Sequence, residues 1–401
     1  MNTRKYILCS STCSAEEYRK VIPDDKDKTN QSIQKFYRVL CDGFVRNDKS
    51  IVVFSKRPTN LKKSGGRRYF PSKEDLVAGV HYHYTRLINI KGLDIFYSLF
   101  SSFFWFLNPC HCRKDDVVII DPLNLAIGMG CLMACKLRGV RTLAFVTDLI
   151  THYTFGDMMP SSFVKYSYWV QTHTDGMIFV TEQMNEASNP KHKPYIVVEG
   201  FVDSNMAEKS VSPKEKYNNL VCLYSGGIEK HYGLDMLVEG FVKAGIPHSE
   251  LHLYGPGHYV EEIIELAKAH PNIKYYGCKE NAIVVKEQMK ATLLVNPRYT
   301  DAEYTKYSFP GKNMEYMVSG TATLTTVLPG MPKEYYPHVF LLENETVEGM
   351  MLKLQEVFGK PKSEIEAFGK ETKEWMLENK NNKKQVGKII LFVEESMIRN
   401  K

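Results

Sequence analysis

The stretch "NLVCLYSGGIEKHYGLDMLVEGF", residues 219–241, decides the fold class of this chain. It begins with an apolar run, which is typical of a strand buried on both faces of a parallel sheet. Gly226 and Gly227 end the run, and the spacing of apolar residues then predicts a helix near 233–244. A strand, a glycine turn and a helix in this order form the repeating unit of doubly wound α/β folds.

The same alternation continues in both directions from this stretch. The second half contains six predicted strands, "NLVCLYSG", "ELHLYG", "NIKYYG", "ATLLVNP", "TATLTT" and "HVFLLE", with helices near 233–244, 258–270, 280–290 and 308–319. The first half contains "KYILCSS", "SIVVFS", "DVVIIDP", "RTLAFVTD", "DGMIFVT" and "PYIVVEG", with helix patterns at 31–45, 124–138 and 161–174. The sequence therefore predicts two doubly wound, Rossmann-like α/β domains that face each other across a cleft.

The domain boundaries are predicted from changes in composition. The polar segment "EGFVDSNMAEKSVSPKEKYNN", residues 199–219, separates two strands and contains Pro and Ser, which is typical of a linker. We expect an N-terminal domain over 1–205 and a C-terminal domain over 206–378. Residues 379–401 are expected to form a helix that packs back on the N-terminal domain.

The composition excludes several classes of protein. With 401 residues, 43% apolar and 24% charged, the chain is long enough for two globular domains. The N-terminal apolar run is too short for a secretory signal, and nine scattered cysteines fit a reducing cytosol. "CHC" at 110–112 lacks the spacing of a zinc site. Nucleic acid is not an expected partner, because no nucleic-acid module accompanies the net charge of +6.

Two stretches of the first half suggest a surface partner. "KRPTNLKKSGGRRYFPSK", residues 56–73, contains seven basic side chains and no acidic one, so it is either a solvated loop or a contact for an anionic surface. "LDIFYSLFSSFFWFLNP", residues 93–109, is rich in aromatic side chains. It is either a core helix or a helix that lies in a bilayer interface, because it is too short to span a membrane.

The segment "YSFPGKNMEYMVSG", residues 307–320, raises an electrostatic question. We expect a helix that is capped by Ser308 and begins near Pro310. Its N-terminus favours anions, yet Lys312 lies in the first turn and Lys306 just before it. Either the lysines are solvated side chains, or an anion such as a phosphate binds there. Glu315, one turn later, is placed to accept two sugar hydroxyls, and a phosphate followed by a sugar describes a nucleotide.

These residues resemble bacterial glycosyltransferases of the GT-B fold, family-4 type, which build capsule, O-antigen or exopolysaccharide. The similarity is strongest from about 221 to 330, where "YSGGIEKHYGLDMLVEGF", "LHLYGPGHY" and "LLVNPR" followed by "YTKYSFPGKNMEYMVSGTATLTTVLPGMP" resemble motifs of the donor domain. "VTDLITHY", "FVTEQMN" and "VEGFVD" resemble weaker landmarks of the acceptor domain.

The resemblance implies roles for particular residues. Glu315 would bind the ribose, and the loop and helix start, with Lys306, Tyr307, Ser308, Phe309 and Lys312, would hold the diphosphate and sugar. Gly226 and Gly227 would let the backbone approach the phosphates, and Gly255 would end the strand that approaches the base. Asp148 lies near the position of a catalytic His-Asp pair in many relatives, with Thr147 in place of the histidine.

The chain also departs from the family pattern. The first of two family glutamates is replaced by Tyr307, and the usual Arg and Lys after the first donor-domain strand are replaced by Gly227 and Tyr232. We therefore infer that Lys312, Lys306 and Arg298 supply the positive charge at the leaving diphosphate. The only Asp-x-Asp sequence, "DKD" at 25–27, lies in a charged stretch, so a metal-independent mechanism without cofactors is expected.

The predicted function is that of a retaining, hexosyltransferase-type glycosyltransferase of surface polysaccharide biosynthesis. It would take a nucleotide-diphosphate sugar, with a UDP-sugar expected first, and a glycan or lipid-linked glycan acceptor. We expect it to be cytoplasmic and peripheral on the inner face of the membrane, with an anionic membrane surface as a partner. The alternatives are a GT-B-like nucleotide-sugar epimerase, a phosphorylase, or a non-catalytic protein that keeps the fold.

Overall fold

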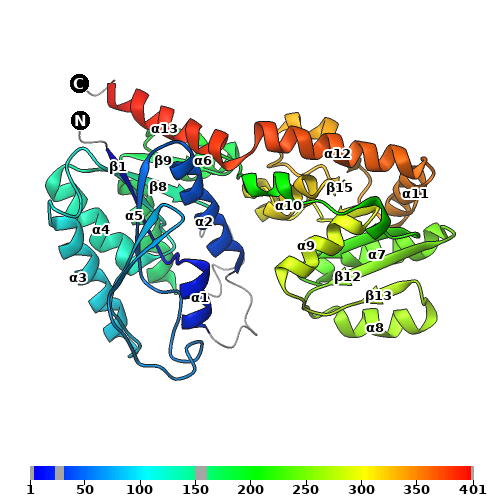
Figure 1. Ribbon diagram of the computed structural model, residues 1–401, viewed down its shortest axis with the longest axis horizontal. Coiled ribbons are helices and arrows are strands. Elements are labelled where there is room, and N and C mark those ends of the chain that lie inside the picture. Colours follow the sequence, from blue (N-terminus) through cyan, green and yellow to red (C-terminus); the bar gives the residue numbers. More distant parts are fainter. Residues whose placement is uncertain (1–3, 23–30, 150–159, 399–401) are drawn as a thin grey trace. The chain divides into compact units, whose positions relative to one another are not determined.

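The chain folds into two α/β units, each with its own main sheet (Figure 1). The computed structural model describes residues 4–22, 31–149 and 160–398. Unit 1 comprises Met1–Phe201 together with Asn382–Lys401, and unit 2 comprises Val202–Asn381. The chain therefore leaves unit 1 at Phe201 and returns to it at Asn382.

In the described part of unit 1, eight strands form one sheet in the order β10-β9-β8-β7-β1-β2-β5-β4. All pair in parallel except β4 with β5. The strands are β1 (Lys5–Ser10), β2 (Ser50–Ser55), β4 (Lys73–Val77), β5 (Val80–Tyr84), β7 (Val117–Ile120), β8 (Arg141–Val146), β9 (Gly176–Phe179) and β10 (Tyr195–Val197). The order reverses between β1 and β7, so the carboxyl ends of these two strands mark the point where such sheets bind ligands.

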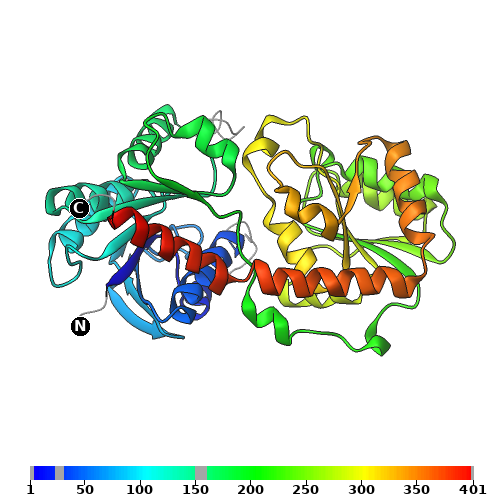
Figure 2. The same ribbon diagram turned by 90° about the horizontal axis from the view of Figure 1, so that it is seen from above.

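The helices of unit 1 follow the predicted alternation. They are α1 (Ala15–Val21), α2 (Gln31–Arg46), α3 (Leu93–Leu107), α4 (Leu125–Arg138), α5 (Ser161–His173), α6 (Glu182–Ser188) and α13 (Asn382–Ile398). The C-terminal α13 packs against α2, and the two helices run side by side in Figure 2. The buried Asn382 side chain begins this contact, because its amide donates to the Val39 carbonyl at 3.0 Å and to Asp42 at 2.7 Å.

Residues 69–88 contain strands that the sequence analysis did not predict. The antiparallel hairpin β4–β5 extends the main sheet, and β3 (Tyr69–Phe70) pairs with β6 (Leu87–Ile88) in a separate two-stranded sheet. The basic segment 56–73 is therefore partly ordered as strand. The edge strand β4 is polar and mostly exposed, so it lacks the apolar run by which the buried strands were recognised.

Unit 2 has a wholly parallel six-stranded sheet within its described residues, in the order β13-β12-β11-β14-β15-β16. Its strands are β11 (Leu220–Ser225), β12 (Ser249–Tyr254), β13 (Ile273–Tyr275), β14 (Leu293–Asn296), β15 (Ala322–Thr326) and β16 (Phe340–Leu342). All six match the predicted strands. This order is that of a Rossmann sheet, and its reversal lies between β11 and β14.

Helices cover both faces of the unit 2 sheet. They are α7 (Leu234–Ala244), α8 (Val260–Ala269), α9 (Asn281–Lys290), α10 (Gly311–Ser319), α11 (Val347–Phe358) and α12 (Lys362–Asn379), with short 3-10 turns η3 (Ser204–Glu208), η4 (Pro213–Glu215), η5 (Lys230–Tyr232), η6 (Glu303–Tyr307) and η7 (Lys333–His338). Helix α7 packs against α11, while α10 packs against α9 and α12. The sheet residues between these layers are almost entirely buried, which gives unit 2 a core of its own.

Candidate functional site

A glycine follows each of the neighbouring strands β11 and β12, and the backbones of these two glycines lie against each other. Gly226 has φ 150° and Gly255 has φ 129°, conformations that side chains disfavour. A Cβ on Gly255 would lie 1.9 Å from the Gly226 carbonyl oxygen, and one on Gly226 would lie 2.1 Å from Lys312 Nζ. Both positions therefore require glycine, and their small size brings Lys312 against the turn after β11.

Helix α10 begins beside this turn without a side-chain cap. Pro310 is its N-cap residue and Gly311 its first residue. The predicted cap by Ser308 is wrong, because Ser308 instead ends the preceding turn η6. Since proline has no side-chain acceptor, the first amides of α10 have no cap of the usual kind and remain a site that favours an anion.

The Lys312 ammonium group has an aromatic partner. Lys312 Nζ donates a hydrogen bond to Tyr224 Oη at 2.8 Å and lies 4.0 Å from the centroid of the Tyr224 ring. Tyr224 Oη in turn donates to the Gly227 carbonyl at 2.8 Å. Burial raises the pKa of Tyr224 well above its usual range, so the partner of Lys312 is a neutral phenol.

Arg298 adds a second positive charge near Lys312. It follows β14 by two residues, and its guanidinium lies 4.8 Å from the centroid of the Tyr232 ring and 5.8 Å from that of Tyr304. Burial lowers the pKa of Lys312 well below its usual range and Arg298 lowers it further, while Glu315 acts in the opposite direction. Burial is the main cause of the lowered pKa, and the nearby Arg298 adds to it.

Neither cation forms an ion pair with a carboxylate anywhere in the described parts of the chain. Both side chains are partly buried, and lysine and arginine that lose contact with water normally pair with acids. Here Lys312 and Arg298 contact aromatic rings and a phenol instead. An anionic ligand would complete their environment.

Glu315 is held by a buried amide. Gln288, on α9, is fully buried, and its Nε2 donates to Glu315 Oε1 at 3.0 Å and to Ser225 Oγ at 3.0 Å. The Ser225 amide also donates to Tyr316 Oη at 2.8 Å. The first turns of α10 are thus tied to the end of β11, and the partly exposed Glu315 carboxylate is fixed at the same edge as Lys312.

The other predicted residues of this loop differ in their exposure. Lys306, in η6, is exposed, while Tyr307 and Ser308 are partly exposed. Phe309 is buried, and its ring centroid lies 4.8 Å from that of Tyr335 in the hydrophobic core. Its side chain therefore anchors the loop, and only its backbone groups are left to face a ligand.

Asp148 belongs to a polar cluster in unit 1. It follows β8 by two residues and accepts a hydrogen bond from Thr147 Oγ1 at 3.1 Å. Asp121 follows β7, is buried, and accepts from Ser10 Oγ at 3.2 Å and from the Leu123 amide at 3.0 Å. Burial raises the pKa of Asp121 to about 6, although these hydrogen bonds oppose the shift.

A small pocket lies next to these carboxylates. Its lining comes from the loop after β7, from the end of β8 and from α5, and consists of Pro122, Leu123, Val146, Thr147, Asp148, Leu149, Ser167, Tyr168 and Gln171. The "DKD" motif at 25–27 lies outside the described residues. The same is true of the histidine and the aspartate within residues 150–159. In the part of the chain that the structure describes, no group of three or more His, Cys, Asp or Glu side chains is arranged to hold a metal ion.

Three residues of the unit 2 site escaped the sequence analysis. Tyr224 and Gln288 contact Lys312 and Glu315, and Tyr316 joins α10 to β11. Tyr224 lies near the end of an apolar strand, where the sequence predicts an ordinary core residue. Gln288 lies in a helix with charged residues, where the sequence predicts an ordinary surface residue. The signal available for Tyr224 was its position at the carboxyl end of β11, two residues before Gly226, where strand ends bind ligands.

Comparison with known proteins agrees with this architecture. Residues 219–359 match the protein family described as Glycosyl transferases group 1. The matched residues lie within unit 2. No curated protein is similar enough in sequence to match the chain.

Solved structures match this chain over almost its whole length. The sucrose-phosphate synthase of Thermosynechococcus elongatus has a TM-score of 0.68 at 12% identity and covers 99% of this chain and 100% of its own. A glycosyltransferase from Rickettsia africae has a TM-score of 0.67 at 12% identity over 100% of both chains. Anabaena HepE, solved in complex with UDP, has a TM-score of 0.63 at 11% identity and covers 98% of this chain and 100% of its own. The predicted GT-B fold is confirmed.

Proposed function

We propose that the protein is a retaining glycosyltransferase that uses a nucleotide-diphosphate sugar, with UDP as the nucleotide, and that the diphosphate binds between the glycine turn and the start of α10. The observation that supports this most directly is the pair of cations, Lys312 and Arg298, whose partners are aromatic rings and a phenol. An anion of two phosphates matches two cations and an uncapped helix N-terminus. Related structures support UDP, because HepE was solved with UDP and GtfA with UDP and GlcNAc.

Each residue of the site has a proposed role. Glu315, held by Gln288, accepts hydrogen bonds from the ribose hydroxyls. Gly226 and Gly227 let the backbone approach the phosphates, and Gly255 lies by the base. Lys306 and the backbone of the loop Tyr307, Ser308 and Phe309 contact the diphosphate and sugar.

The chemical role of Lys312 and Arg298 follows from where charge develops. Glycosyl transfer passes through an oxocarbenium-like transition state while negative charge grows on the departing nucleotide. Preorganised cations at the leaving phosphates stabilise that state most when they need not move during the reaction. Lys312 is held in place by Tyr224, and the guanidinium of Arg298 lies over the ring of Tyr232. Tyr232 occupies a position where many members of the family that this chain resembles have a basic side chain. Their preorganised charge favours a metal-independent mechanism.

Asp148 and the acceptor belong to unit 1. We propose that Asp148, at the carboxyl edge of the sheet, contributes to the reacting centre from the acceptor-binding domain. The acceptor is proposed to be a glycan or lipid-linked glycan of surface polysaccharide biosynthesis, so that the enzyme works at the inner face of the cytoplasmic membrane.

A donor panel tests this function. The purified chain is incubated with a set of UDP-, GDP- and dTDP-sugars and a mixed glycan acceptor, in the presence of EDTA, and products are measured by mass spectrometry with NMR of the anomeric proton. We expect transfer or slow hydrolysis of one UDP-sugar with retained configuration. Isomerised donor without transfer would indicate an epimerase, and UDP binding without any turnover would indicate a non-catalytic protein. Activity that EDTA abolishes and Mg²⁺ restores would contradict the metal-independent mechanism.

A further inference from the structure

Helix α3 buries small side chains and exposes large ones, which is the reverse of an ordinary surface helix. Its buried residues include Ser98 and Ser102, while Phe96, Phe100 and Phe104 are 65%, 52% and 63% exposed. Each set repeats every four residues, and the two sets are offset by two residues, so they lie on opposite faces. A helix that covers a core normally buries its large apolar side chains and exposes its polar ones.

Close packing against α4 explains why the serines point inward. A Cβ on Gly130 of α4 would lie 2.2 Å from both the Leu99 carbonyl oxygen and Ser102 Oγ. The small residues Ser102 and Gly130 therefore let the two helix backbones approach each other closely. The phenylalanines on the opposite face of α3 do not take part in this contact.

The exposed apolar face is continuous along the helix. Leu93 is 48% exposed and lies on the same face as the three phenylalanines, three residues before Phe96. We call these four residues the aromatic ridge. Clusters of large exposed apolar side chains on a soluble domain mark a surface that binds something.

The basic segment lies next to the beginning of the aromatic ridge. Strand β3 pairs with β6, and the Asn89 amide donates to the Arg68 carbonyl at 2.8 Å, which holds residues 67–70 beside the chain that enters α3. Lys62, Arg67 and Arg68 are exposed there. Arg67 lies 4.4 Å from the centroid of the Phe70 ring. Three other basic residues of the segment, Lys56, Arg57 and Lys73, pair with Asp94, Glu17 and Asp75. The exposed positive charges on this side of the ridge are therefore those of Lys62, Arg67 and Arg68.

We propose that the aromatic ridge of α3 and the basic segment 56–73 together dock the protein on an anionic lipid bilayer, with α3 lying in the plane of the interface. This proposal rests on the proposed function in one respect, since it supplies the membrane attachment that a lipid-linked acceptor needs. The ridge supplies apolar side chains that enter the acyl boundary, and the segment supplies charges that reach the lipid phosphates.

The shape and charge of this surface favour a bilayer over other occupants. The ridge is the outer face of a single helix, and a bilayer can enclose such a convex apolar surface without a matching groove. The flanking charges match anionic headgroups. Helix α3 has 15 residues, and none of the helices in the described chain combines the length and apolar character that crossing a bilayer requires. Contact with one leaflet is therefore the expected mode.

Vesicle co-sedimentation of the full chain tests the proposal. We expect binding to vesicles of phosphatidylcholine with phosphatidylglycerol at low salt, weaker binding to phosphatidylcholine alone, and loss of binding as salt is raised. The triple variant Phe96→Ser, Phe100→Ser, Phe104→Ser should bind at least about tenfold more weakly. The variant Lys62→Gln, Lys63→Gln, Arg67→Gln, Arg68→Gln should lose both affinity and salt dependence.

Matched controls separate docking from folding. Ile264→Ser with Leu352→Ser removes two apolar side chains of unit 2 that are 43% and 54% exposed, and this variant should bind vesicles like the parent chain. All the changed residues are exposed except Lys63, which is partly exposed, so the melting temperatures of the variants should stay close to that of the parent. A parent chain that ignores anionic vesicles at low salt would overturn the proposal. So would a triple variant that binds them equally well, or self-association through α3 in place of vesicle binding.

The outcome is distinguishable from that of the proposed function. Transfer to a soluble glycan acceptor does not require a membrane, so activity without vesicle binding would leave the glycosyltransferase proposal standing and remove the docking surface. Vesicle binding without transfer would support the docking surface and contradict the glycosyltransferase proposal.

Discussion

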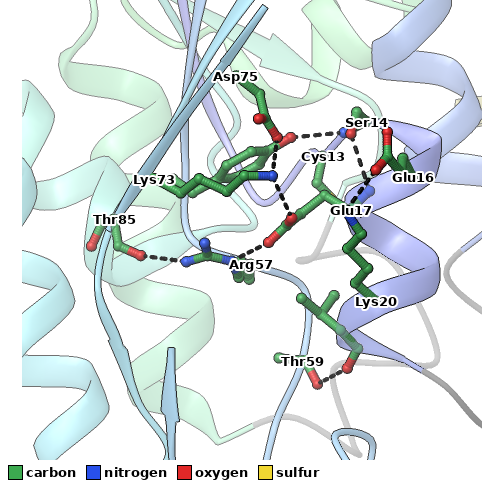
Figure 3. Close-up of polar contacts among 12 residues, drawn as sticks. Cys13, Ser14, Glu16, Glu17, Lys20, Arg57, Thr59, Lys73, Asp75 and Thr85 are labelled. Carbon is green, nitrogen blue, oxygen red and sulfur yellow. Dashed lines mark hydrogen bonds and ion pairs between the residues drawn. The ribbon is translucent and has the colours of Figure 1, made fainter. Parts of the chain in front are cut away.

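The two units each place basic side chains at the carboxyl edge of a parallel sheet, but these charges have different partners. In unit 1, Arg57 and Lys73 both contact the buried Glu17, with Arg57 Nε 2.6 Å from Glu17 Oε1 and Lys73 Nζ 3.1 Å from Glu17 Oε2 (Figure 3). Lys73 also pairs with Asp75 at 2.5 Å. In unit 2, Lys312 and Arg298 contact aromatic rings and a phenol.

The difference distinguishes a structural cluster from a binding site. Burial alone would raise the pKa of Glu17, but hydrogen bonds from Arg57 and Lys73 outweigh burial and hold this pKa below its ordinary value. The two cations and two carboxylates of this cluster in unit 1 sum to no net charge. In unit 2 the pKa of Lys312 is lowered because burial and Arg298 are not offset. Charges that are already neutralised stabilise the fold, whereas charges without acidic partners are available for a ligand.

The largest effect is expected from breaking the neutralised cluster. Arg57→Met removes the guanidinium that contacts Glu17 and the Thr85 carbonyl. Leaving a buried carboxylate short of a partner should lower the free energy of unfolding by about 3–5 kcal/mol, measured by urea denaturation. UDP affinity of the folded protein should not change. Lys20→Met, which removes the exposed partner of Glu16, serves as the control and should have no measurable effect. Unchanged stability with lost activity would mean that the unit 1 cluster binds substrate.

Removing the unpaired charge should affect turnover more than folding. Lys312→Met should lower kcat by about 10²–10³-fold, the usual cost of one preorganised contact to a developing anion, and raise KM less, since the charge matters most in the transition state. Stability should be unchanged or higher by a few tenths of a kcal/mol, because a lysine in the first turn opposes the helix dipole.

Initial-rate kinetics and thermal unfolding measure these two quantities. Lys333→Met, which removes an exposed lysine elsewhere in unit 2, is the matched control and should leave both unchanged. Full turnover and normal UDP affinity in Lys312→Met would show that Lys312 is only a solvated side chain. The claim that unit 2, unlike unit 1, keeps this charge for a ligand would then be wrong.

Glu315 should contribute mainly to binding. Glu315→Gln keeps an acceptor for Gln288 Nε2 but loses the charge that strengthens hydrogen bonds from the ribose. UDP should bind more weakly by about 1.5–3 kcal/mol, or roughly ten- to a hundredfold, as measured by isothermal titration calorimetry. Glu348→Gln, an exposed change on α11, is the control. An unaltered UDP affinity would place the ribose elsewhere.

The smallest effect is a pH dependence that only the unpaired charge can produce. A lowered pKa means that the folded protein binds fewer protons at Lys312 than the unfolded chain, so stability should rise with pH between the lowered pKa and about 10.4. A diphosphate would raise the pKa of Lys312 again. UDP binding should therefore take up protons and weaken as pH rises through the pKa of the free protein.

Calorimetry in two buffers of different ionisation enthalpy measures this proton uptake. Lys312→Met should abolish it, whereas Arg57→Met should not. Equal proton uptake by the parent and Lys312→Met would assign the titration to another group.

The sequence predicted the strand and helix alternation because buried parallel strands are uninterrupted apolar runs and their helices repeat at a period near 3.6. All six strands of unit 2 were found this way. Lys312 and Glu315 were identified together because both lie on one face of a single helix, three residues apart. The edge strand β4 was missed because an exposed strand has no such run, and β5 was missed because its buried residues alternate with histidines.

The tertiary structure decided which side chains from distant segments meet. Tyr224 and Gln288 are 88 and 27 residues from their partners Lys312 and Glu315, and only the pairing of β11 with β14 and the packing of α9 on α10 bring them together. The sequence alone shows that Lys312 is positively charged. Whether that charge is neutralised depends on neighbours that local pattern cannot identify.

Helix α3 also shows which features the sequence predicts and which only tertiary packing decides. Its sequence is apolar almost all round, so periodicity predicts a helix but not which side is buried. That choice was made by packing: Ser102 fits against Gly130 at a distance that no phenylalanine could accept, and Phe96, Phe100 and Phe104 consequently face outward. Local spacing determines what each segment forms, and the close approach of backbones determines which of its side chains remain for function.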